Sequence, residues 1–392
     1  MKLSEKKLKT NQFFFDLHKV LKKKKKPFFL HEPSLDKNDT NLISKCVNSK
    51  FISTAGEYTK KFENELKKFT KSRYVLSVIN GTSALHLAIV VLGIKENEEI
   101  LLPSMTFVAT GNAILYNKSI PHFFDVKEDL TIDFLKLNNY LKKNTKLKNG
   151  KCININTNRV IKAIIPVHIF GHMSDMNELK KLAFKFKLLI IEDATEALGS
   201  YYNKKHAGTF GNIGTLSFNG NKIITTGMGG AILTNNKRTY LKAMHLAATA
   251  KVKSKWDYIH DILGYNYRLP SLNASIGCSQ MKKIKTLIKK KRQLFKMYKI
   301  AFSKSDFLTL VSEQSDSKSN YWLQTVVIKP QFKDLTKMIL NKCYENQIYI
   351  RPVWKPLHQL SYFKKFPKMD LAKTNSLSIR VLNLPSSSFL SK

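Results

Sequence analysis

The sequence predicts an α/β fold, with a large domain built on a mostly parallel sheet and a smaller α+β domain after it. From residue 74 onward, short β-rich runs alternate with helical stretches, which is the pattern of strands joined by crossover helices. The chain has 392 residues, 43% of them hydrophobic, so it can bury the core of one large domain and a smaller one. An aromatic content of 11% indicates a folded chain despite the charge excess.

The strands of the large domain are predicted from runs of apolar and β-branched residues bounded by turn residues. Seven runs qualify: Tyr74–Asn80, Glu98–Met105, Pro121–Val126, Val160–Ile169, Leu188–Ala194, Ile213–Asn219 and Gly229–Thr234. Crossover helices are predicted over Thr82–Leu92 and Asp175–Lys187, where apolar residues recur near helical spacing. These elements together predict a seven-stranded, mostly parallel sheet covered by helices.

The chain is predicted to divide into a Lys-rich N-terminal extension, a large domain and a small C-terminal domain, over residues 1–30, 31–270 and 271–392. The small domain is expected to begin with a long Lys-rich helix at Leu272–Lys304. Its further expected elements are a strand at Tyr321–Lys329, a helix at Leu335–Asn346 and a strand at Ile348–Val353.

The N-terminal extension carries an aromatic patch at Phe13–Phe15 and a lysine run over residues 22–26. A solvated helix packed on the body of the protein is favoured over an amphipathic helix at a membrane surface. No apolar run reaches the roughly 18 residues of a membrane span, and no signal peptide is evident. The four cysteines lie far apart without a CxxC pair, which predicts neither a metal site nor disulfides. We therefore expect a cytoplasmic protein without membrane insertion.

The net charge of +39 raises a second class of function, namely a binding protein for nucleic acid or an anionic membrane surface. Nearly all the basic residues are lysines spread along the chain, whereas specific phosphate and base recognition relies on arginine. Dense charge occurs at residues 22–26 and Lys289–Lys291, without the interleaved aromatic residues of RNA-binding modules. We therefore expect no nucleic-acid partner.

Lys222 follows a predicted strand and lies between an Asn-Gly turn and a glycine-rich segment that ends at Gly230. In so Lys-rich a chain, an ordinary surface lysine is the alternative for this residue taken alone. Covalent catalysis on carbonyl groups needs an amine on a turn beside a cofactor. Ser217 and the neighbouring glycines leave room for a phosphate and a ring, so the context favours a catalytic lysine.

Asp193 ends another predicted strand, at the position where open α/β sheets bind ligands. Pyridoxal phosphate needs an anion beside its pyridine nitrogen, because the protonated ring is what stabilises a carbanion. Asp193 fits that role, although an Asp after a strand also commonly caps the next helix.

Thr82 and Ser83 lie between the first predicted strand and the first crossover helix. Hydroxyl and backbone N–H groups at a helix N-terminus can hold a phosphate, and a simple helix cap has the same sequence. Phe107 follows the second strand, where it could stack on a cofactor ring or belong to the core.

In this order and spacing, these segments resemble the DegT/DnrJ/StrS family of sugar aminotransferases, which are pyridoxal-phosphate enzymes of fold type I. The resemblance runs from about Leu30 to the C-terminus. Further segments are similar to the branch that acts on UDP-4-keto-6-deoxy-N-acetylhexosamines in legionaminic acid or bacillosamine synthesis. They are His31-Glu32-Pro33, Gly208–Gly211, Gly264–Arg268, Asn320–Trp322 and Arg351–Trp354.

The resemblance implies that Lys222 binds pyridoxal phosphate covalently and moves the proton, and that Asp193 holds the ring nitrogen. The residues implied in binding the phosphate are Thr82, Ser83, Ser217 and Asn266. Because Asn266 would reach in from a second subunit, the resemblance implies a homodimer with shared active sites.

Further roles follow from the same resemblance. Phe107 would stack on the ring, and Glu196 would position the cofactor or the sugar. The implied substrate contacts are Arg268, Trp354 and His358. Two departures from the family pattern, Thr195 in place of Ala and Met228 within the glycine-rich turn, remove no chemical group.

The implied reaction is a ping-pong transfer of an amino group from L-glutamate to C4 of a UDP-4-keto-6-deoxy-N-acetylhexosamine. Members of this fold with a His in place of the lysine catalyse dehydration, so Lys222 favours an aminotransferase. The alternative substrate is GDP-4-keto-6-deoxymannose, which would give perosamine.

Overall fold

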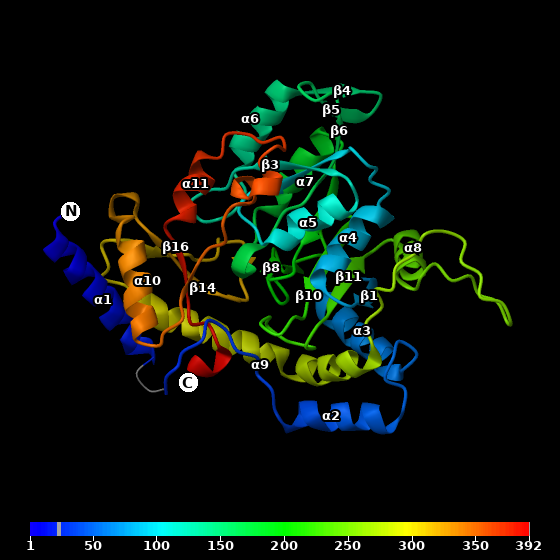
Figure 1. The fold of residues 1–392 in the computed structure, drawn as a ribbon, viewed down its shortest axis with the longest axis horizontal. Coiled ribbons are helices and arrows are strands. Elements are labelled where there is room, and N and C mark those ends of the chain that lie inside the picture. Colours follow the sequence, from blue (N-terminus) through cyan, green and yellow to red (C-terminus); the bar gives the residue numbers. More distant parts are fainter. Residues whose placement is uncertain (22–24, 392) are drawn as a thin grey trace.

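The computed structural model describes residues 1–21 and 25–391. Its centre is a large sheet whose strands have the following bounds: β1 (Tyr74–Val78), β2 (Glu99–Pro103), β3 (Ile120–Phe124), β4 (Thr145–Lys148), β5 (Lys151–Asn154), β6 (Val160–Ile164), β7 (Leu189–Asp193), β10 (Ile213–Ser217) and β11 (Gly230–Thr234). The main strand order is β1-β11-β10-β7-β6-β2-β3, and β5 pairs with β4 and with the start of β6 (Figure 1).

The strands β3, β2, β6, β7 and β10 pair in parallel, whereas β11 is antiparallel to both β10 and β1. All seven predicted strands are confirmed as members of this mostly parallel sheet. The run predicted over Val160–Ile169 is too long, because the regular strand ends at Ile164, Val167 makes only an isolated bridge to Asp193, and the chain turns at Phe170, where φ is 54°. The β4–β5 hairpin was not predicted, since β4 is exposed and lysine-rich and the alternate buried residues of β5, Cys152 and Asn154, do not form an apolar pattern.

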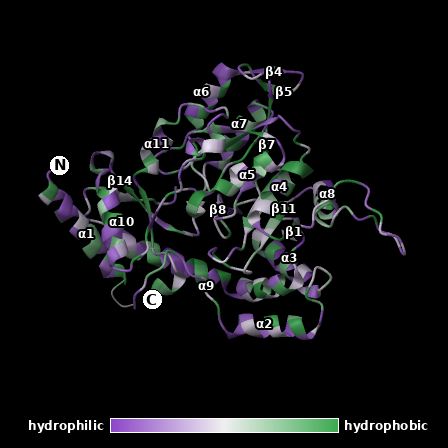
Figure 2. Ribbon diagram, in the orientation of Figure 1, coloured by the Kyte–Doolittle hydropathy of each residue, from purple (hydrophilic) through white to green (hydrophobic). Residues whose placement is uncertain are grey.

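The helix α4 (Gly81–Val91) packs on β7, β10 and β11 and is almost entirely buried. It is hydrophobic on nearly all sides, as Figure 2 shows, because α5 (Val108–Tyr116) and α8 (Lys237–Ala247) flank it. Its start at the end of β1 directs its N-terminus toward the carboxyl ends of the neighbouring parallel strands. The predicted helices over Thr82–Leu92 and Asp175–Lys187 are confirmed as α4 and α7 (Met176–Lys185).

The long helix α9 (Ser271–Ala301) packs on α2 (Lys37–Asn48) and α3 (Glu57–Thr70) in its first half. Its second half packs in a separate hydrophobic cluster through Leu294 and Tyr298. The helix therefore belongs to the packing of both halves of the molecule, and its predicted bounds are confirmed to within three residues.

The C-terminal part contains an antiparallel sheet with the order β12-β14-β16-β15. Its elements are β12 (Leu308–Leu310), β14 (Gln324–Ile328), β15 (Arg351–Pro352), β16 (Val381–Leu384), α10 (Leu335–Glu345) and α11 (Ala372–Ser378). The strand predicted at Ile348–Val353 is reduced to two residues, while the predicted helix and the other strand are confirmed.

The N-terminal extension forms α1 (Leu3–Leu21), which packs against α10 and α9 (Figure 1). Phe13, Leu17 and Leu21 are fully buried in the same cluster as Tyr298. The expected helix packed on the body is therefore confirmed, and the extension completes the core of the C-terminal part. Of the lysine run over 22–26, residues 22–24 lie outside the described residues.

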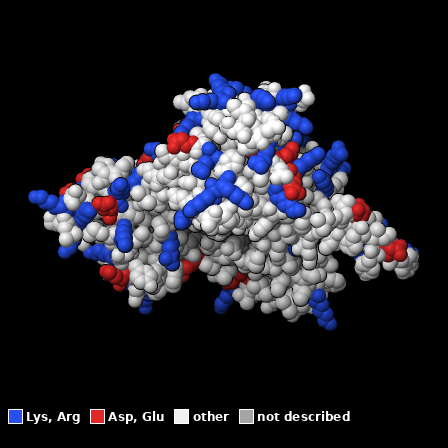
Figure 3. All heavy atoms as spheres, turned by 45° about the horizontal axis from the view of Figure 1, so that its top comes forward, with Lys and Arg blue, Asp and Glu red and all other residues white. Residues whose placement is uncertain are grey.

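Two further features lie at the surface. A small sheet contains β8 (Tyr201–Tyr202), β9 (Lys205–His206) and β13 (Ser317–Lys318), and α6 (Phe134–Asn144) precedes the β4–β5 hairpin. Lys and Arg side chains are spread over the face in Figure 3, with far fewer Asp and Glu. Over the described ranges, no helix combines the length and the apolar character needed to cross a bilayer.

Candidate active site

A cavity of about 780 Å³ opens at the carboxyl ends of β7 and β10, beside the N-terminus of α4. This edge is where ligands bind in open α/β sheets, and residues near β15 and β14 close the other side. The predicted site residues that line the cavity are Thr82, Phe107, Asp193, Glu196, Ser217, Lys222 and Trp354. The fold therefore brings together residues that are far apart in the sequence.

Asp193 is the last residue of β7, and two hydroxyl groups hold its carboxylate in place. Thr110 Oγ1 donates to Oδ2 at 2.7 Å, and Thr195 Oγ1 donates to Oδ1 at 2.7 Å. The Thr195 backbone N–H adds a weaker bond to Oδ1 at 3.2 Å. Asp193 is only 3% exposed, so this carboxylate is fixed and faces the cavity.

Lys222 lies on the turn after β10, where its backbone N–H donates to Asn219 O at 3.0 Å. Its Nζ lies 3.4 Å from Glu196 Oε1 and 4.0 Å from the centroid of the Trp322 ring. The side chain is 13% exposed and is directed into the cavity. The amine is therefore sheltered but can reach a ligand in the cavity.

Glu196 is the buried acid beside this amine. Its Oε2 accepts a hydrogen bond from Phe170 N at 2.8 Å, and its side chain is 5% exposed. Burial raises the pKa of the Glu196 carboxyl, and the nearby positive charge of Lys222 partly opposes this effect. Glu196 is thus a buried carboxyl group 3.4 Å from Lys222 Nζ.

The start of α4 provides the groups of a phosphate cradle. Thr82 and Ser217 line the cavity, and a Cβ on Gly81 would lie 3.0 Å from Ser217 Cβ, so the glycine allows the helix start to approach β10. Asn80 caps the helix by accepting from Ser83 N at 2.7 Å. Ser83 lines a smaller neighbouring cavity instead.

Aromatic side chains form one wall of the cavity. Phe107 is 49% exposed and lies 5.6 Å from Trp354 between ring centroids. The ring centroid of the fully buried Phe170 lies 5.2 Å from that of Trp354 and 6.4 Å from that of Trp322. Phe107, Trp322 and Trp354 line the cavity and offer an apolar face against which a planar ligand can stack.

The cavity has the groups that pyridoxal phosphate requires. It contains an amine that can form the covalent link, a fixed carboxylate for the ring nitrogen, and hydroxyls at a helix N-terminus for the phosphate. Its volume and its aromatic wall accommodate a ring. In the part of the chain that the structure describes, no group of three or more His, Cys, Asp and Glu residues could hold a metal ion.

Besides Ser83, three predicted residues lie outside the cavity lining of this chain. Arg268 is near Glu63, with NH2 3.6 Å from Oε1. His358 pairs through Nδ1 with Ser104 Oγ at 2.6 Å. Asn266 is exposed and pairs with Ala248 in an isolated bridge. Their roles in substrate and phosphate binding stay predictions.

Sequence reasoning missed Thr110 and gave Trp322 no role. Thr110 lies on α5 and meets Asp193 across 83 positions of the sequence, so no local motif could identify it. Thr195 was noted as a departure, and the structure shows that its hydroxyl supports Asp193.

Comparison with known proteins identifies the family. The model of the DegT/DnrJ/EryC1/StrS aminotransferase family matches residues 33–392. The chain belongs to this family. It is a sugar aminotransferase with pyridoxal phosphate as its cofactor.

Among the relatives of this DegT-family chain is a GDP-perosamine synthase from Escherichia coli O157:H7, which is 34% identical and covers 91% of this chain and 92% of its own length. A UDP-4-amino-4,6-dideoxy-N-acetyl-beta-L-altrosamine transaminase from Campylobacter jejuni is 31% identical over 85% of both chains. The solved structure of Helicobacter pylori PseC, an aminotransferase involved in the biosynthesis of pseudoaminic acid, superposes with a TM-score of 0.83. It is 28% identical and covers 92% of this chain and 94% of its own.

Proposed function

We propose that the enzyme transfers an amino group from L-glutamate to C4 of a nucleoside-diphosphate-activated 4-keto-6-deoxy sugar. The observation that carries this proposal is the position of Lys222, whose amine points into the same cavity as the fixed carboxylate of Asp193. The relatives named above act on GDP- and UDP-linked amino sugars, which supports a nucleotide-activated acceptor.

Pyridoxal phosphate, when bound, supplies the electron sink for removing and returning a proton at carbon. Lys222 binds it through Nζ and, once released, carries the proton at Nζ. The Asp193 carboxylate, which two threonine hydroxyls hold in place, orients the ring. Thr82 and Ser217 bind the phosphate. The aromatic wall offers the ring an apolar surface to pack against.

Two nucleotide sugars are candidates for the acceptor. The UDP-4-keto-6-deoxy-N-acetylhexosamine is supported by the segments His31–Pro33 and Arg351–Trp354, several of whose residues line the cavity. The GDP-4-keto-6-deoxymannose is supported by two GDP-perosamine synthases that are 34% and 33% identical. A glutamate-dependent amination assay with each sugar, alone and in competition, separates them by kcat/KM. Amination of neither sugar refutes the proposed acceptor class.

Substitution Lys222→Ala tests the covalent role directly. The variant is expected to lose glutamate-dependent amination and the visible absorbance of covalently bound cofactor, because alanine has no amine. Lys146→Ala removes an exposed lysine on β4 and serves as the matched control with wild-type turnover. Full turnover of Lys222→Ala would exclude Lys222 as the cofactor lysine.

We also propose a homodimer in which Asn266 completes the partner's phosphate site. Asn266 lies at the base of an arm over residues 251–263, a hairpin that projects from the body (Figure 1). Trp256 and Leu263 on this arm are 79% and 81% exposed, which favours a partner surface that covers them.

The arm is tested by the double substitution Trp256→Ser and Leu263→Ser, with sedimentation velocity as the measurement. The variant is expected to shift from dimer to monomer at low micromolar concentration, because it loses the apolar area that the partner would bury. Lys255→Ser, at an exposed polar position of the same arm, is the control and should remain dimeric. A monomeric wild-type enzyme, or a double variant as dimeric as the wild type, would contradict this arrangement.

A further inference from the structure

Trp322 lies directly against the amine of Lys222. Lys222 Nζ is 4.0 Å from the centroid of the indole ring, within the range of a cation–π contact. The indole Nε1 donates to Asn221 O at 2.7 Å, so the same side chain also holds the backbone before Lys222. Trp322 is 3% exposed, so the indole is a buried, fixed side chain.

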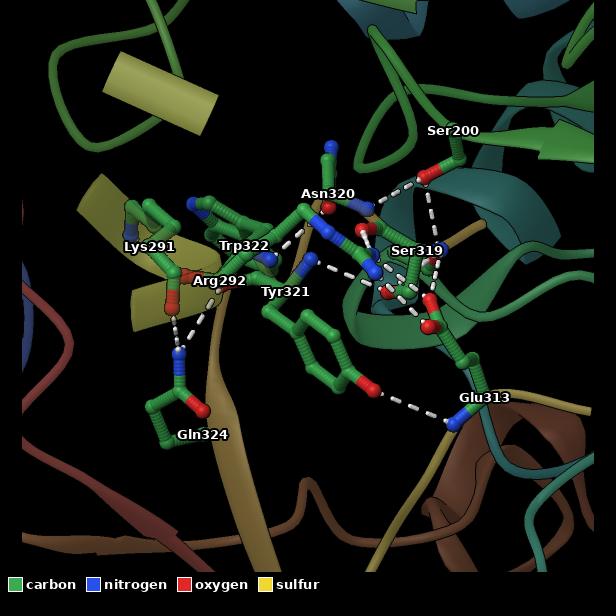
Figure 4. Close-up of polar contacts among 10 residues, drawn as sticks. Ser200, Lys291, Arg292, Glu313, Ser319, Asn320, Tyr321, Trp322 and Gln324 are labelled. Carbon is green, nitrogen blue, oxygen red and sulfur yellow. Dashed lines mark hydrogen bonds and ion pairs between the residues drawn. The ribbon is translucent and has the colours of Figure 1, made fainter. Parts of the chain in front are cut away.

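The backbone of Trp322 is fixed by two buried side chains, shown in Figure 4. Asn320 Oδ1 accepts from Trp322 N at 2.8 Å, while Asn320 Nδ2 donates to the carbonyl oxygens of Glu196 and Leu198. Lys291 Nζ donates to Trp322 O at 2.7 Å. The indole is therefore tied to the loop that carries Glu196 and to α9.

The residue before Trp322 is held in a conformation that a bulky side chain rarely adopts. Tyr321 has a φ of 47°, and its ring stacks on Phe295 with centroids 4.0 Å apart. Its backbone N–H donates to Ser319 Oγ at 2.9 Å. Such strain persists only where surrounding contacts impose it, and it clusters at functional sites. Here it orients the indole toward Lys222.

The two other features beside Lys222 hold the amine less closely. Glu196 Oε1 is 3.4 Å away, longer than the 2.7–2.9 Å of a strong charge-assisted bond. His31 lines the same cavity, and burial lowers the pKa of its imidazole well below its usual value. The ring face of Trp322 therefore supports the free amine together with the more distant Glu196 carboxylate.

We propose that the indole of Trp322 is the resting site of the Lys222 ammonium group during the part of the cycle when Lys222 is not bonded to the cofactor. Trp322 is then a positioning residue: it retains the amine within reach and fixes the turn that carries it. This inference rests on the proposed role of Lys222 as the cofactor lysine.

The test uses the full-length enzyme loaded with pyridoxamine phosphate, in which Lys222 is free. Lys222 is acetylated with acetic anhydride at fixed pH. The rate of acetylation at Lys222 is measured by mass spectrometry, relative to the rate at exposed lysines of the same chain. Trp322→Leu is expected to raise the Lys222 rate about threefold to tenfold, because the ammonium form loses its support. Trp322→Phe, which retains an aromatic face, should stay within about twofold of the wild type.

Trp354→Leu is the control for accessibility, since it opens the same cavity at a position away from the amine. Equal rates for Trp322→Leu and Trp322→Phe, or an equal rise in Trp354→Leu, would overturn the proposal.

Stepwise fluorination of tryptophan, which weakens the ring face without changing its shape, replaces Trp322→Leu if that variant does not fold. The labelling rate should rise with each fluorine, and a constant rate would overturn the proposal. Covalent cofactor binding by Lys222→Ala would instead refute the proposed function.

Discussion

Replacing Thr110 with Val tests whether the carboxylate of Asp193 is held as the structure shows. Valine has nearly the volume of threonine but no hydroxyl, so the substitution removes the 2.7 Å bond to Asp193 Oδ2, and with it the 3.0 Å contact to Thr106 Oγ1, without opening a cavity. Thr110 is 1% exposed and Asp193 is 3% exposed, so the lost donor is a buried one. A hydrogen bond to a charged group contributes about 1.5–3 kcal/mol, which predicts a loss of this size in the free energy of unfolding.

The assay is thermal unfolding of the cofactor-free enzyme, in which a chain of this length should lose roughly 2 to 4 °C in Tm. Thr70→Val is the matched control, because Thr70 is also 1% exposed and donates at 2.8 Å to a neutral acceptor, Leu66 O. A neutral bond contributes about 0.5–1.5 kcal/mol, so the control should lose about half as much. If Thr110→Val costs no more than Thr70→Val, the Thr110 hydroxyl does not anchor a carboxylate.

Two further predictions concern stability. His172 is buried, its ring nitrogens have no partner among the described residues, and burial lowers its pKa to about 4. The unfolded chain protonates this ring near pH 6.5 and the folded chain only near pH 4, so stability falls by about 3 kcal/mol as pH drops through that window. His172→Phe should flatten this part of the curve of unfolding free energy against pH, and parallel curves would contradict the reasoning. Gly171→Ala should cost at least twice as much Tm as Gly150→Ala: both have positive φ, but a Cβ on Gly171 would lie 1.9 Å from a side-chain oxygen while Gly150 faces open space. Equal losses of Tm would show that the neighbouring side chain moves aside at little cost in stability.

The sheet was predictable because its strands are local apolar runs between turn residues, and such runs need no knowledge of their partners. The β4–β5 hairpin was not predictable in the same way, and neither was the shortness of β15, since their backbone pairing does not depend on an apolar pattern. The packing of α1 was predictable only in kind. Its aromatic patch indicated a contact with the body, but the partners on α9 and α10 lie about 300 residues away in the chain.

The residues of the site divide in the same way, into those that a local sequence pattern reveals and those that only the folded chain brings together. Lys222, Asp193 and Thr82 each stand at the end of a strand or the start of a helix, positions that the sequence pattern locates. Trp322 and Thr110 are typical core residues by sequence, and only the folded chain places them against Lys222 and Asp193. Groups that do the chemistry are therefore easier to predict than the groups that hold them.

The manner in which each group is held matches what it must do. The carboxylate of Asp193 receives short bonds from Thr110 and Thr195 on separate segments, which suits a charge that stays in one place through the whole reaction. Among the residues that the structure describes, the amine of Lys222 meets a ring face and a carboxylate at 3.4 Å, without a shorter bond. A directional hydrogen bond would have to break each time the amine moves, whereas a ring face attracts the ammonium over a broad range of positions. The carboxylate of Asp193 is held by directional hydrogen bonds because it must stay in place. The amine of Lys222 is held by less directional contacts because it must move during the reaction.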